Sequence, residues 1–332
     1  MVPLRRCGSH ALRLRLSASK ELFAPYPLHL VDFLPLVPLY GDLSRDAAYF
    51  QMTLDLIGLL NASPVRWEGL SFDPVAFFEQ IKDKPRSPHA IAWEMLFHGA
   101  RARGARVALD KSLDSIHAWP ELMRLYPDAL FVNVVRDPRA QVSSMNRAII
   151  YEFDSLLNAE TLRDAYAAAG ALARAHPDRV LTLRFEDFIA DEAGTLRRLC
   201  AFLGLTFEPE MLDIAASEEA RRISDRSALW ESNRFPPIPA NVDKFRKVLA
   251  ADEIETIETV AGQVMDAHGY ERMTPGKARI GEEARSAARR RSQERRAKAW
   301  AEMQITRPMD HAVRRFRADF LESCRRRLVG AK

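Results

Sequence analysis

The sequence of 332 residues is 47% hydrophobic and 9% aromatic, which is enough apolar material for one large domain or two small ones. No stretch approaches the roughly 18 uninterrupted apolar residues of a membrane-spanning helix, and the N-terminus lacks the apolar core of a signal peptide. The three cysteines lie far apart and indicate neither a disulfide framework nor a zinc site. We therefore expect a bacterial-type cytoplasmic protein that binds no metal.

The charge is distributed unevenly along the chain. Residues 276–332 contain 17 Lys and Arg against 7 Asp and Glu, whereas residues 1–275 contain 32 and 38. We therefore expect a domain over residues 1–275 and a basic extension over 276–332, whose Ala, Arg, Glu and Gln favour helix. Such a helix can be solvated, pair with a second copy in a homodimer, or lie peripherally on an anionic surface such as the inner membrane. No nucleic-acid partner is expected.

The chain opens with a motif that is suited to binding an anion. Gly8 and Ser9 precede an apolar-periodic helix, and backbone N–H groups at such a helix start can contact a phosphate or a sulfate. The Walker A spacing of a P-loop kinase is absent. Residues 22–43 follow with four prolines among aromatic residues, and they predict an irregular segment that carries His29 and Asp32.

Helices and short strands are expected between this segment and residue 130. Apolar residues recur at helical spacing over 45–61 and 88–103, and a further helix begins near residue 74. Residues 63–70 suggest a short strand. Residues 107–112 predict another strand, which ends in the polar residues Asp110, Lys111 and Ser112.

The most informative stretch runs from residue 131 to residue 144. An apolar run over 131–135 predicts a strand buried on both faces, and the Asp-Pro pair after Arg136 suits the start of a helix. Ser144 follows about two helical turns later and returns to the same side of that helix. A guanidinium and a hydroxyl at the carboxyl edge of an open α/β sheet suit a phosphate. Alternatively, Arg136 pairs with Asp137 or Glu186.

Further strands and helices are expected downstream. Residues 179–187 predict a third strand. Near its end the aromatic Phe185 is followed by two acidic residues. Residues 196–205 predict a helix that Gly204 stops, and another helix is expected over about 251–268.

In chain order over about residues 5–270, these motifs resemble those of the sulfotransferases that use 3′-phosphoadenosine-5′-phosphosulfate (PAPS), in particular bacterial, carbohydrate-sulfotransferase-like members. The resemblance implies an α/β fold, namely a P-loop-like three-layer sandwich with a mostly parallel central sheet. It implies that PAPS is the donor and that no metal is required. It also implies that the acceptor presents a hydroxyl or an amine, and a carbohydrate such as an envelope glycan is our first expectation.

The resemblance also implies roles for individual residues. Arg136 and Ser144 stand where the family holds the 3′-phosphate, and Phe185 stands where an aromatic ring lies near the adenine. Lys111 stands where a lysine points at the phosphosulfate.

The 5′-phosphosulfate loop of the family corresponds to Arg6, Cys7, Gly8, Ser9 and His10. Arg6 takes the place of the catalytic cation that precedes this loop. Cys7 and His10 depart from the usual hydroxyl residues.

The base that takes the acceptor's proton is not fixed by these motifs. In related enzymes it often lies shortly after the anion loop, which favours His29 and then Asp32, with Glu94 and His117 as further alternatives. Two other functions stay open. One is an ATP-using kinase of the P-loop type, and the other is a sulfotransferase-like protein that has lost catalysis and binds a nucleotide or a polyanion.

Overall fold

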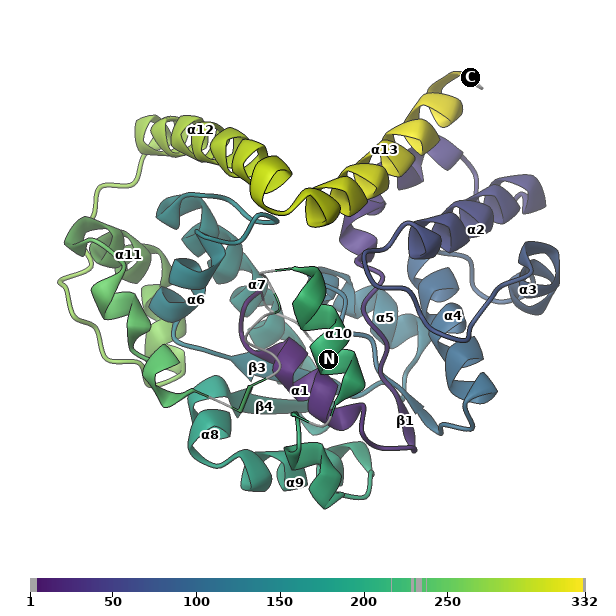
Figure 1. Ribbon diagram of the computed structural model, residues 1–332, viewed down its shortest axis with the longest axis horizontal. Coiled ribbons are helices and arrows are strands. Elements are labelled where there is room, and N and C mark those ends of the chain that lie inside the picture. The colour runs from purple at the N-terminus through teal and green to yellow at the C-terminus, as the bar shows by residue number, and fades with distance from the viewer. Residues whose placement is uncertain (1–4, 216, 228–229, 231–234, 237, 331–332) are drawn as a thin grey trace.

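The structure is a computed structural model that describes residues 5–215, 217–227, 230, 235–236 and 238–330. Helices dominate it, and short strands lie among them (Figure 1). Within the described part of the chain, the strands form two separate two-stranded parallel sheets. One sheet pairs β1 (Leu22–Phe23) with β2 (Val107–Ala108), and the other pairs β3 (Phe131–Val135) with β4 (Val180–Arg184).

The helices surround these sheets in groups. In Figure 1, α2, α3 and α4 lie on one side of the molecule, α6 and α11 on the other, and α12 and α13 meet at an angle above both groups. The bounds are α1 (Ser9–Leu16), α2 (Asp46–Asn61), α3 (Pro74–Ile81), α4 (Pro88–Ala102), α5 (Trp119–Leu125), α6 (Pro138–Met145), α7 (Ser155–Ala175), α8 (Phe185–Ala190), α9 (Glu192–Leu203), α10 (Glu218–Arg226), α11 (Ala251–Ala267), α12 (Glu282–Thr306) and α13 (Pro308–Gly330).

The expected three-layer sandwich around one central sheet is confirmed only in part. The strands are parallel as predicted. Among the described residues, however, no strand pairs with both sheets, and residues 63–70 contain no strand. Pro25 and Pro27 follow β1 and cannot donate the N–H groups that a longer ladder needs. The third strand ends at Arg184 because Phe185 begins α8. The sequence also suggests a very short strand before the anion loop, over residues 1–4, which lie outside the described residues.

The turn after β3 forms as the sequence predicts. All five residues of β3 are buried, and each pairs with β4, from Phe131 opposite Val180 to Val135 opposite Arg184. The Asp137 carboxylate accepts a hydrogen bond from the Arg139 N–H at 2.9 Å and so caps α6. Arg136 therefore leaves the carboxyl end of β3 at a fixed position.

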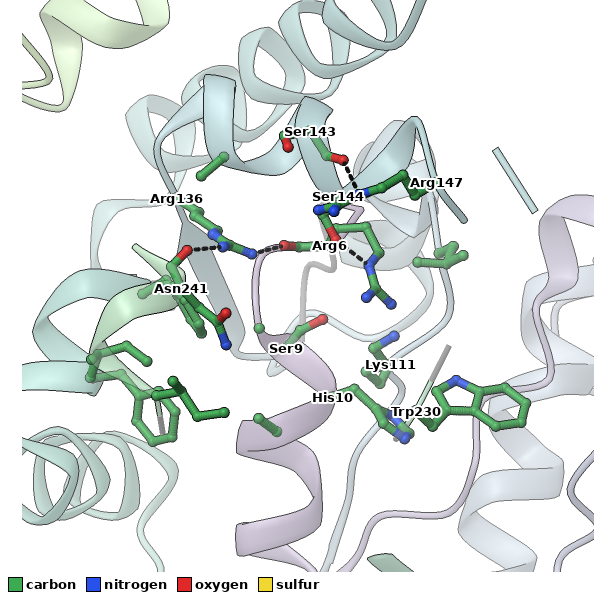
Figure 2. A pocket seen from close by; sticks show the side chains of 18 of the residues that line it. Arg6, Ser9, His10, Lys111, Arg136, Ser143, Ser144, Arg147, Trp230 and Asn241 are labelled. Carbon is green, nitrogen blue, oxygen red and sulfur yellow. Dashed lines mark hydrogen bonds between the residues drawn. The ribbon is translucent and has the colours of Figure 1, made fainter. Parts of the chain in front are cut away.

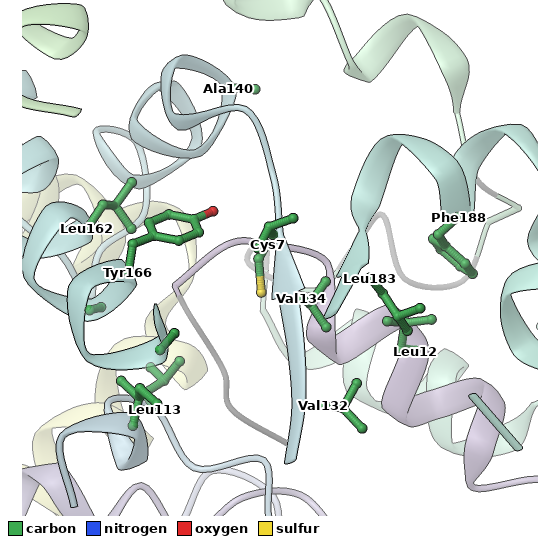
Figure 3. Packing of buried hydrophobic residues seen from close by; sticks show 14 of the residues in the cluster. Cys7, Leu12, Leu113, Val132, Val134, Ala140, Leu162, Tyr166, Leu183 and Phe188 are labelled. Atoms are coloured by element: carbon green, nitrogen blue, oxygen red, sulfur yellow. The ribbon is translucent and has the colours of Figure 1, made fainter. Parts of the chain in front are cut away.

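The larger of the core clusters ties the anion loop to this strand. Figure 3 shows Val132 and Val134 of β3 beside Leu12 of α1 and Leu183 of β4. The Cys7 side chain belongs to the same cluster, lies beside β3 in Figure 3 and is 0% exposed. Because such a core is close-packed, the start of α1 is held at a constant distance from the end of β3.

The basic extension is helical, and its two helices contact the rest of the chain. The Ser292 hydroxyl of α12 accepts a hydrogen bond from the Phe153 N–H at 3.0 Å. On α13, Cys324 and Leu328 are buried in the core cluster that α2 and α4 share. The division into 1–275 and 276–332 stays a prediction. No helix in the described part of the chain combines the length and the apolar character needed to cross a bilayer.

Candidate active site

A cavity of about 320 Å³ opens where α1, β3 and α6 meet, which is within the size range of small-molecule sites. Its described lining contains six cationic side chains and no Asp or Glu. Figure 2 shows Arg136 and Asn241 on one side of Arg6, and Lys111, His10 and Trp230 on the other. The site is therefore electropositive and suits an anionic ligand.

The start of α1 is shaped by Gly8, which has the left-handed φ of 90°. A Cβ atom at this position would lie 2.3 Å from the Phe185 ring, so only glycine allows the loop to approach that ring. Arg6 also has a positive φ, of 58°, which costs about 1 kcal/mol or more in a non-glycine residue. Arg136 Nη1 donates to the Arg6 carbonyl at 3.1 Å and stabilises that conformation.

Arg6 and Ser144, which the sequence assigned to two different motifs, lie together in the structure. Arg6 Nε donates to Ser144 Oγ at 3.0 Å, and Arg136 approaches from the other side (Figure 2). The structure therefore brings the cation of the anion loop next to the hydroxyl and the guanidinium of the second motif.

Arg136 does not form the side-chain pairs that were its alternative interpretation. Asp137 instead binds the Arg139 guanidinium at 2.7 Å, and Glu186 accepts a hydrogen bond from the Asp137 N–H at 3.0 Å. The Arg136 guanidinium lies 4.5 Å from the centre of the Phe185 ring and donates to the Asn241 carbonyl at 3.1 Å. Its buried Nε has no hydrogen-bond partner among the described residues. Arg136 thus lies at the cavity with an Nε–H group that donates to no described residue.

Lys111 also lines the cavity and is 8% exposed. Burial disfavours the charged ammonium and lowers its pKa from 10.5 to about 8. Lys111 forms no ion pair with a carboxylate among the described residues. An anion in the cavity would restore the charged form, because it would supply the missing opposite charge.

Two half-buried imidazoles, those of His10 and His29, face the same cavity. Burial lowers the pKa of His29 and of His10 well below 6.5, and neighbouring cations act in the same direction. Both are therefore neutral at pH 7. His29 Nδ1 and His10 Nε2 are buried without a hydrogen-bond partner among the described residues. His29 Nε2 lies 3.4 Å from the Tyr26 hydroxyl.

The other candidate bases lie elsewhere. Asp32 is exposed and pairs with Arg317 at 3.0 Å, and Glu94 pairs with Lys84 at 2.8 Å. His117 is exposed. None of these three belongs to the described lining of the cavity, whereas His29 does.

The residues of the 5′ loop separate into two groups. Arg6, Gly8, Ser9 and His10 line the cavity. The Cys7 side chain points into the core instead, where burial raises the pKa of its thiol. Cys7 was expected at a phosphate-contacting position of the loop. Its side chain is instead buried in the core and does not belong to the described lining of the cavity.

Several lining residues were not predicted from the sequence. Ser143 precedes Ser144 on α6, and Arg147 follows the end of that helix. Their proximity to Ser144 in the sequence was the available signal. Tyr166 lies behind the cavity, and its hydroxyl accepts a hydrogen bond from the Arg136 N–H at 3.0 Å. Trp230 and Asn241 come from the region between α10 and α11, which has no pattern that marks individual residues.

Residues 1–209 match the Sulfotransferase family. The chain belongs to that family. The matched range is more than half of the chain and includes the anion loop, Lys111, Arg136 and Ser144. The family that the motifs resemble is thereby confirmed.

Curated relatives of this member of the Sulfotransferase family are similar over shorter segments. Omega-hydroxy-beta-dihydromenaquinone-9 sulfotransferase Stf3 of Mycobacterium bovis is 27% identical over 173 residues, covering 48% of this chain and 40% of that protein. Carbohydrate sulfotransferase 2 of Mus musculus is 33% identical over 93 residues, covering 28% of this chain and 17% of that protein. The matched segments thus span less than half the length of either relative.

Two solved structures share the fold of this member of the Sulfotransferase family. The sulfotransferase domain of the Synechococcus PCC 7002 olefin synthase has a TM-score of 0.54 and 24% identity, with 78% of this chain and 92% of that domain covered. The sulfotransferase domain from the curacin biosynthetic pathway has a TM-score of 0.50 and 19% identity, with 80% and 95% covered. The mostly helical α/β arrangement with small parallel sheets is therefore that of sulfotransferase domains.

Proposed function

We propose that this protein transfers a sulfuryl group from PAPS to a hydroxyl or amine of an acceptor. The observation that carries the proposal is the meeting of Arg6, Arg136 and Ser144 at one cavity whose described lining has no carboxylate. Such a cation-rich site is suited to a donor with several negative charges. A kinase is less well supported, because the loop lacks the Walker lysine spacing.

Each side of the cavity has a role in this proposal. Arg136 and Ser144 hold the 3′-phosphate, while Phe185, beneath the Arg136 guanidinium, lies near the adenine. Ser9 and the backbone N–H groups at the start of α1 receive the 5′-phosphosulfate. Arg6 and Lys111 then neutralise the charge that develops on the leaving phosphate.

The reaction is an in-line transfer between oxygen atoms, or from oxygen to nitrogen. The acceptor atom bonds to sulfur as the bond from sulfur to the phosphate oxygen breaks, and the acceptor proton goes to a base. We assign that base to His29, because its neutral imidazole lines the cavity and retains an unpartnered nitrogen. The products are the sulfated acceptor and adenosine 3′,5′-bisphosphate.

The acceptor side of the cavity is aromatic and apolar. Tyr26, Tyr151 and Trp230 contribute rings, and Ile150 lies at the border with solvent. Rings of this kind can cover the apolar faces of a sugar, so a carbohydrate hydroxyl is the first acceptor we propose. The apolar border favours a second candidate, a hydroxyl on a lipid-like molecule, and the name of the mycobacterial relative describes an acceptor of that kind.

Two experiments test the proposal. Calorimetry should detect binding of adenosine 3′,5′-bisphosphate at an affinity at least tenfold above that for ATP or 5′-AMP, since only the first presents both phosphates (roughly 1.4 kcal/mol per tenfold). Transfer from ³⁵S-labelled PAPS should then be screened against oligosaccharides and against hydroxylated isoprenoid lipids in detergent. Preference for ATP would favour the kinase, and binding without transfer to any acceptor would favour a protein that has lost catalysis.

A further inference from the structure

The last helix of the chain reaches into the segment that carries His29. Arg317 of α13 is 8% exposed and lies 285 residues from Asp32 in the sequence. Its Nη2 donates to the Leu28 carbonyl at 2.9 Å and to the His29 carbonyl at 3.3 Å, and its Nη1 donates to the Leu59 carbonyl at 3.3 Å. The same guanidinium pairs with Asp32 at 3.0 Å. One side chain thus joins α13 to both ends of the His29 turn.

The turn needs such support because of its backbone conformation. His29 has a φ of 54°, in the left-handed region that non-glycine residues rarely adopt. Its carbonyl accepts from the Asp32 N–H at 3.2 Å as well as from Arg317. A planar guanidinium can satisfy several carbonyls at fixed angles, which an ammonium cannot do. Arg317 therefore orients the backbone from which the His29 imidazole enters the cavity.

A second set of contacts from α13 reaches the region around Trp230, another residue that lines the cavity. Asp310 Oδ2 accepts a hydrogen bond from the Ser227 hydroxyl at 2.6 Å. The Arg314 guanidinium lies 5.7 Å from the centre of the Trp230 ring, which lines the cavity. Both contacts are made by the first part of α13, just before Arg317. The helix thus contacts both the His29 turn and Trp230.

We propose that α13 completes the acceptor half of the site and that Arg317 is a positioning residue for His29. This inference rests on the proposed function, since it assigns to His29 the proton of the acceptor. Arg317 itself does not line the cavity among the described residues. It acts by holding the turn so that the imidazole keeps one orientation towards the acceptor. The donor half is expected not to depend on it, because the described hydrogen bonds of Arg136 and Ser144 are made with Arg6, Tyr166 and Asn241, none of which belongs to α13.

The test compares three variants of the full-length protein. Arg317→Ala removes the guanidinium. Arg317→Lys keeps the positive charge but loses the planar group that donates to several carbonyls at fixed angles. Arg327→Ala is the matched control, since Arg327 is also on α13 and pairs with Asp55 of α2, remote from the cavity. Three quantities are measured: the Kd of adenosine 3′,5′-bisphosphate, kcat for transfer to the best acceptor of the screen, and hydrogen exchange of the Asp32 and Phe33 amides. Those amides donate to the His29 and Leu30 carbonyls and report directly on the turn.

The expected result separates donor binding from turnover. Arg317→Ala should lower kcat on the order of ten- to a hundredfold, as misplaced catalytic groups do, with the nucleotide Kd within about twofold of wild type. Exchange of the two amides should accelerate about tenfold or more. Arg317→Lys should recover part of kcat, and Arg327→Ala should change neither kcat nor exchange of the turn.

Several results would overturn the inference. Unchanged kcat and unchanged amide exchange in Arg317→Ala would show that the His29 turn keeps its conformation without Arg317. Equal losses of kcat and nucleotide affinity in Arg317→Ala and Arg327→Ala would show that α13 only stabilises the fold. If Arg317→Ala does not fold, the same comparison is made with Arg317→Lys. Failure of the wild type to bind the bisphosphate refutes the proposed function instead, while amide exchange still decides whether Arg317 holds the turn.

Discussion

Arg6 and Ser144 are 138 residues apart in the sequence, and a hydrogen bond of 3.0 Å joins Arg6 Nε to Ser144 Oγ. Each belongs to a different anion-binding motif, one before α1 and the other on α6. Arg136 strengthens the link, because it donates to the Arg6 carbonyl at 3.1 Å. The two motifs therefore form one continuous surface, and substitutions in either should affect the same ligand.

Replacing Arg136 with alanine should abolish most donor binding. A buried charge-assisted contact to phosphate contributes about 2–4 kcal/mol, so the Kd of adenosine 3′,5′-bisphosphate should rise by roughly 30-fold to 1000-fold. Calorimetry measures this directly. Arg179→Ala is the control, since Arg179 precedes β4 and pairs with Asp128 in solvent. Binding of Arg136→Ala within threefold of wild type would contradict the assignment.

Replacing Arg6 with alanine should reduce turnover far more than nucleotide affinity. Its charge is needed mainly where negative charge grows on the leaving phosphate, so kcat should fall by about a hundredfold or more while Kd changes much less. Steady-state kinetics with the best acceptor of the screen, together with calorimetry, separates the two quantities. A rise in KM with kcat intact would show that Arg6 only binds.

The lowered pKa of Lys111 predicts a pH dependence of donor binding. A lysine must be protonated to attract a phosphate, and Lys111 loses its proton as the pH rises through about 8. The affinity for adenosine 3′,5′-bisphosphate should therefore be constant near pH 7 and fall by about tenfold towards pH 9.5, as a charged contact is lost. Lys111→Arg, which stays charged, should remove this fall. A flat wild-type profile from pH 7 to 9.5 would show that Lys111 does not contact the nucleotide.

The motif around Arg136 could be predicted because its information is local. An apolar strand, a capping Asp137 and a helix that returns Ser144 to the same side are all encoded within residues 131–144. The β3 strand and α6 therefore lie where the sequence places them. The single central sheet was not found, because local patterns do not determine how many short strands pair.

The acceptor side could not be predicted because its contacts are long-range. Arg317 holds the His29 turn across 288 residues of sequence, and no periodicity links the two positions. The extension has few apolar residues, which suggested a solvated helix. Some of these, such as Cys324 and Leu328 of α13, are buried against the body, whereas others, such as Phe316, are exposed. Position around the helix, more than apolar content, determined how this segment packs.

Peripheral membrane attachment through residues 276–332 stays a prediction, and the structure identifies the residues that test it. Ile305 and Met309 are each 82% exposed beside the junction of α12 and α13, and Phe316 continues the apolar surface. Exposed arginines such as Arg315 lie on the same helix. An apolar surface with cationic neighbours suits an anionic bilayer, whereas two copies of so basic a segment would repel each other.

Vesicle flotation measures this attachment. Wild-type protein should float with vesicles that contain phosphatidylglycerol and phosphatidylcholine, less at high salt, and little with phosphatidylcholine alone. Met309→Ser with Phe316→Ser should lower the vesicle partition coefficient by about a hundredfold or more, since each buried apolar side chain contributes about 1.5 kcal/mol or more. Val75→Ser, at a 61% exposed position on α3, is the control. No flotation, together with a dimer that the double variant dissociates, would assign the surface to a second copy.

The pKa of His29 predicts how turnover depends on pH. Burial holds that pKa well below 6.5, so the imidazole is neutral and able to accept a proton throughout the range from pH 6.5 to 8. Turnover should fall only when the pH drops through this lowered value, which places the acidic limb of the kcat profile below pH 6.5. His29→Asn should lower kcat by about a hundredfold and remove that limb, with the nucleotide Kd unchanged. His10→Asn is the informative comparison, because His10 is a second neutral imidazole at the cavity and belongs to the donor loop. If His29→Asn keeps more than a tenth of kcat with the limb intact while His10→Asn loses both, the base is His10.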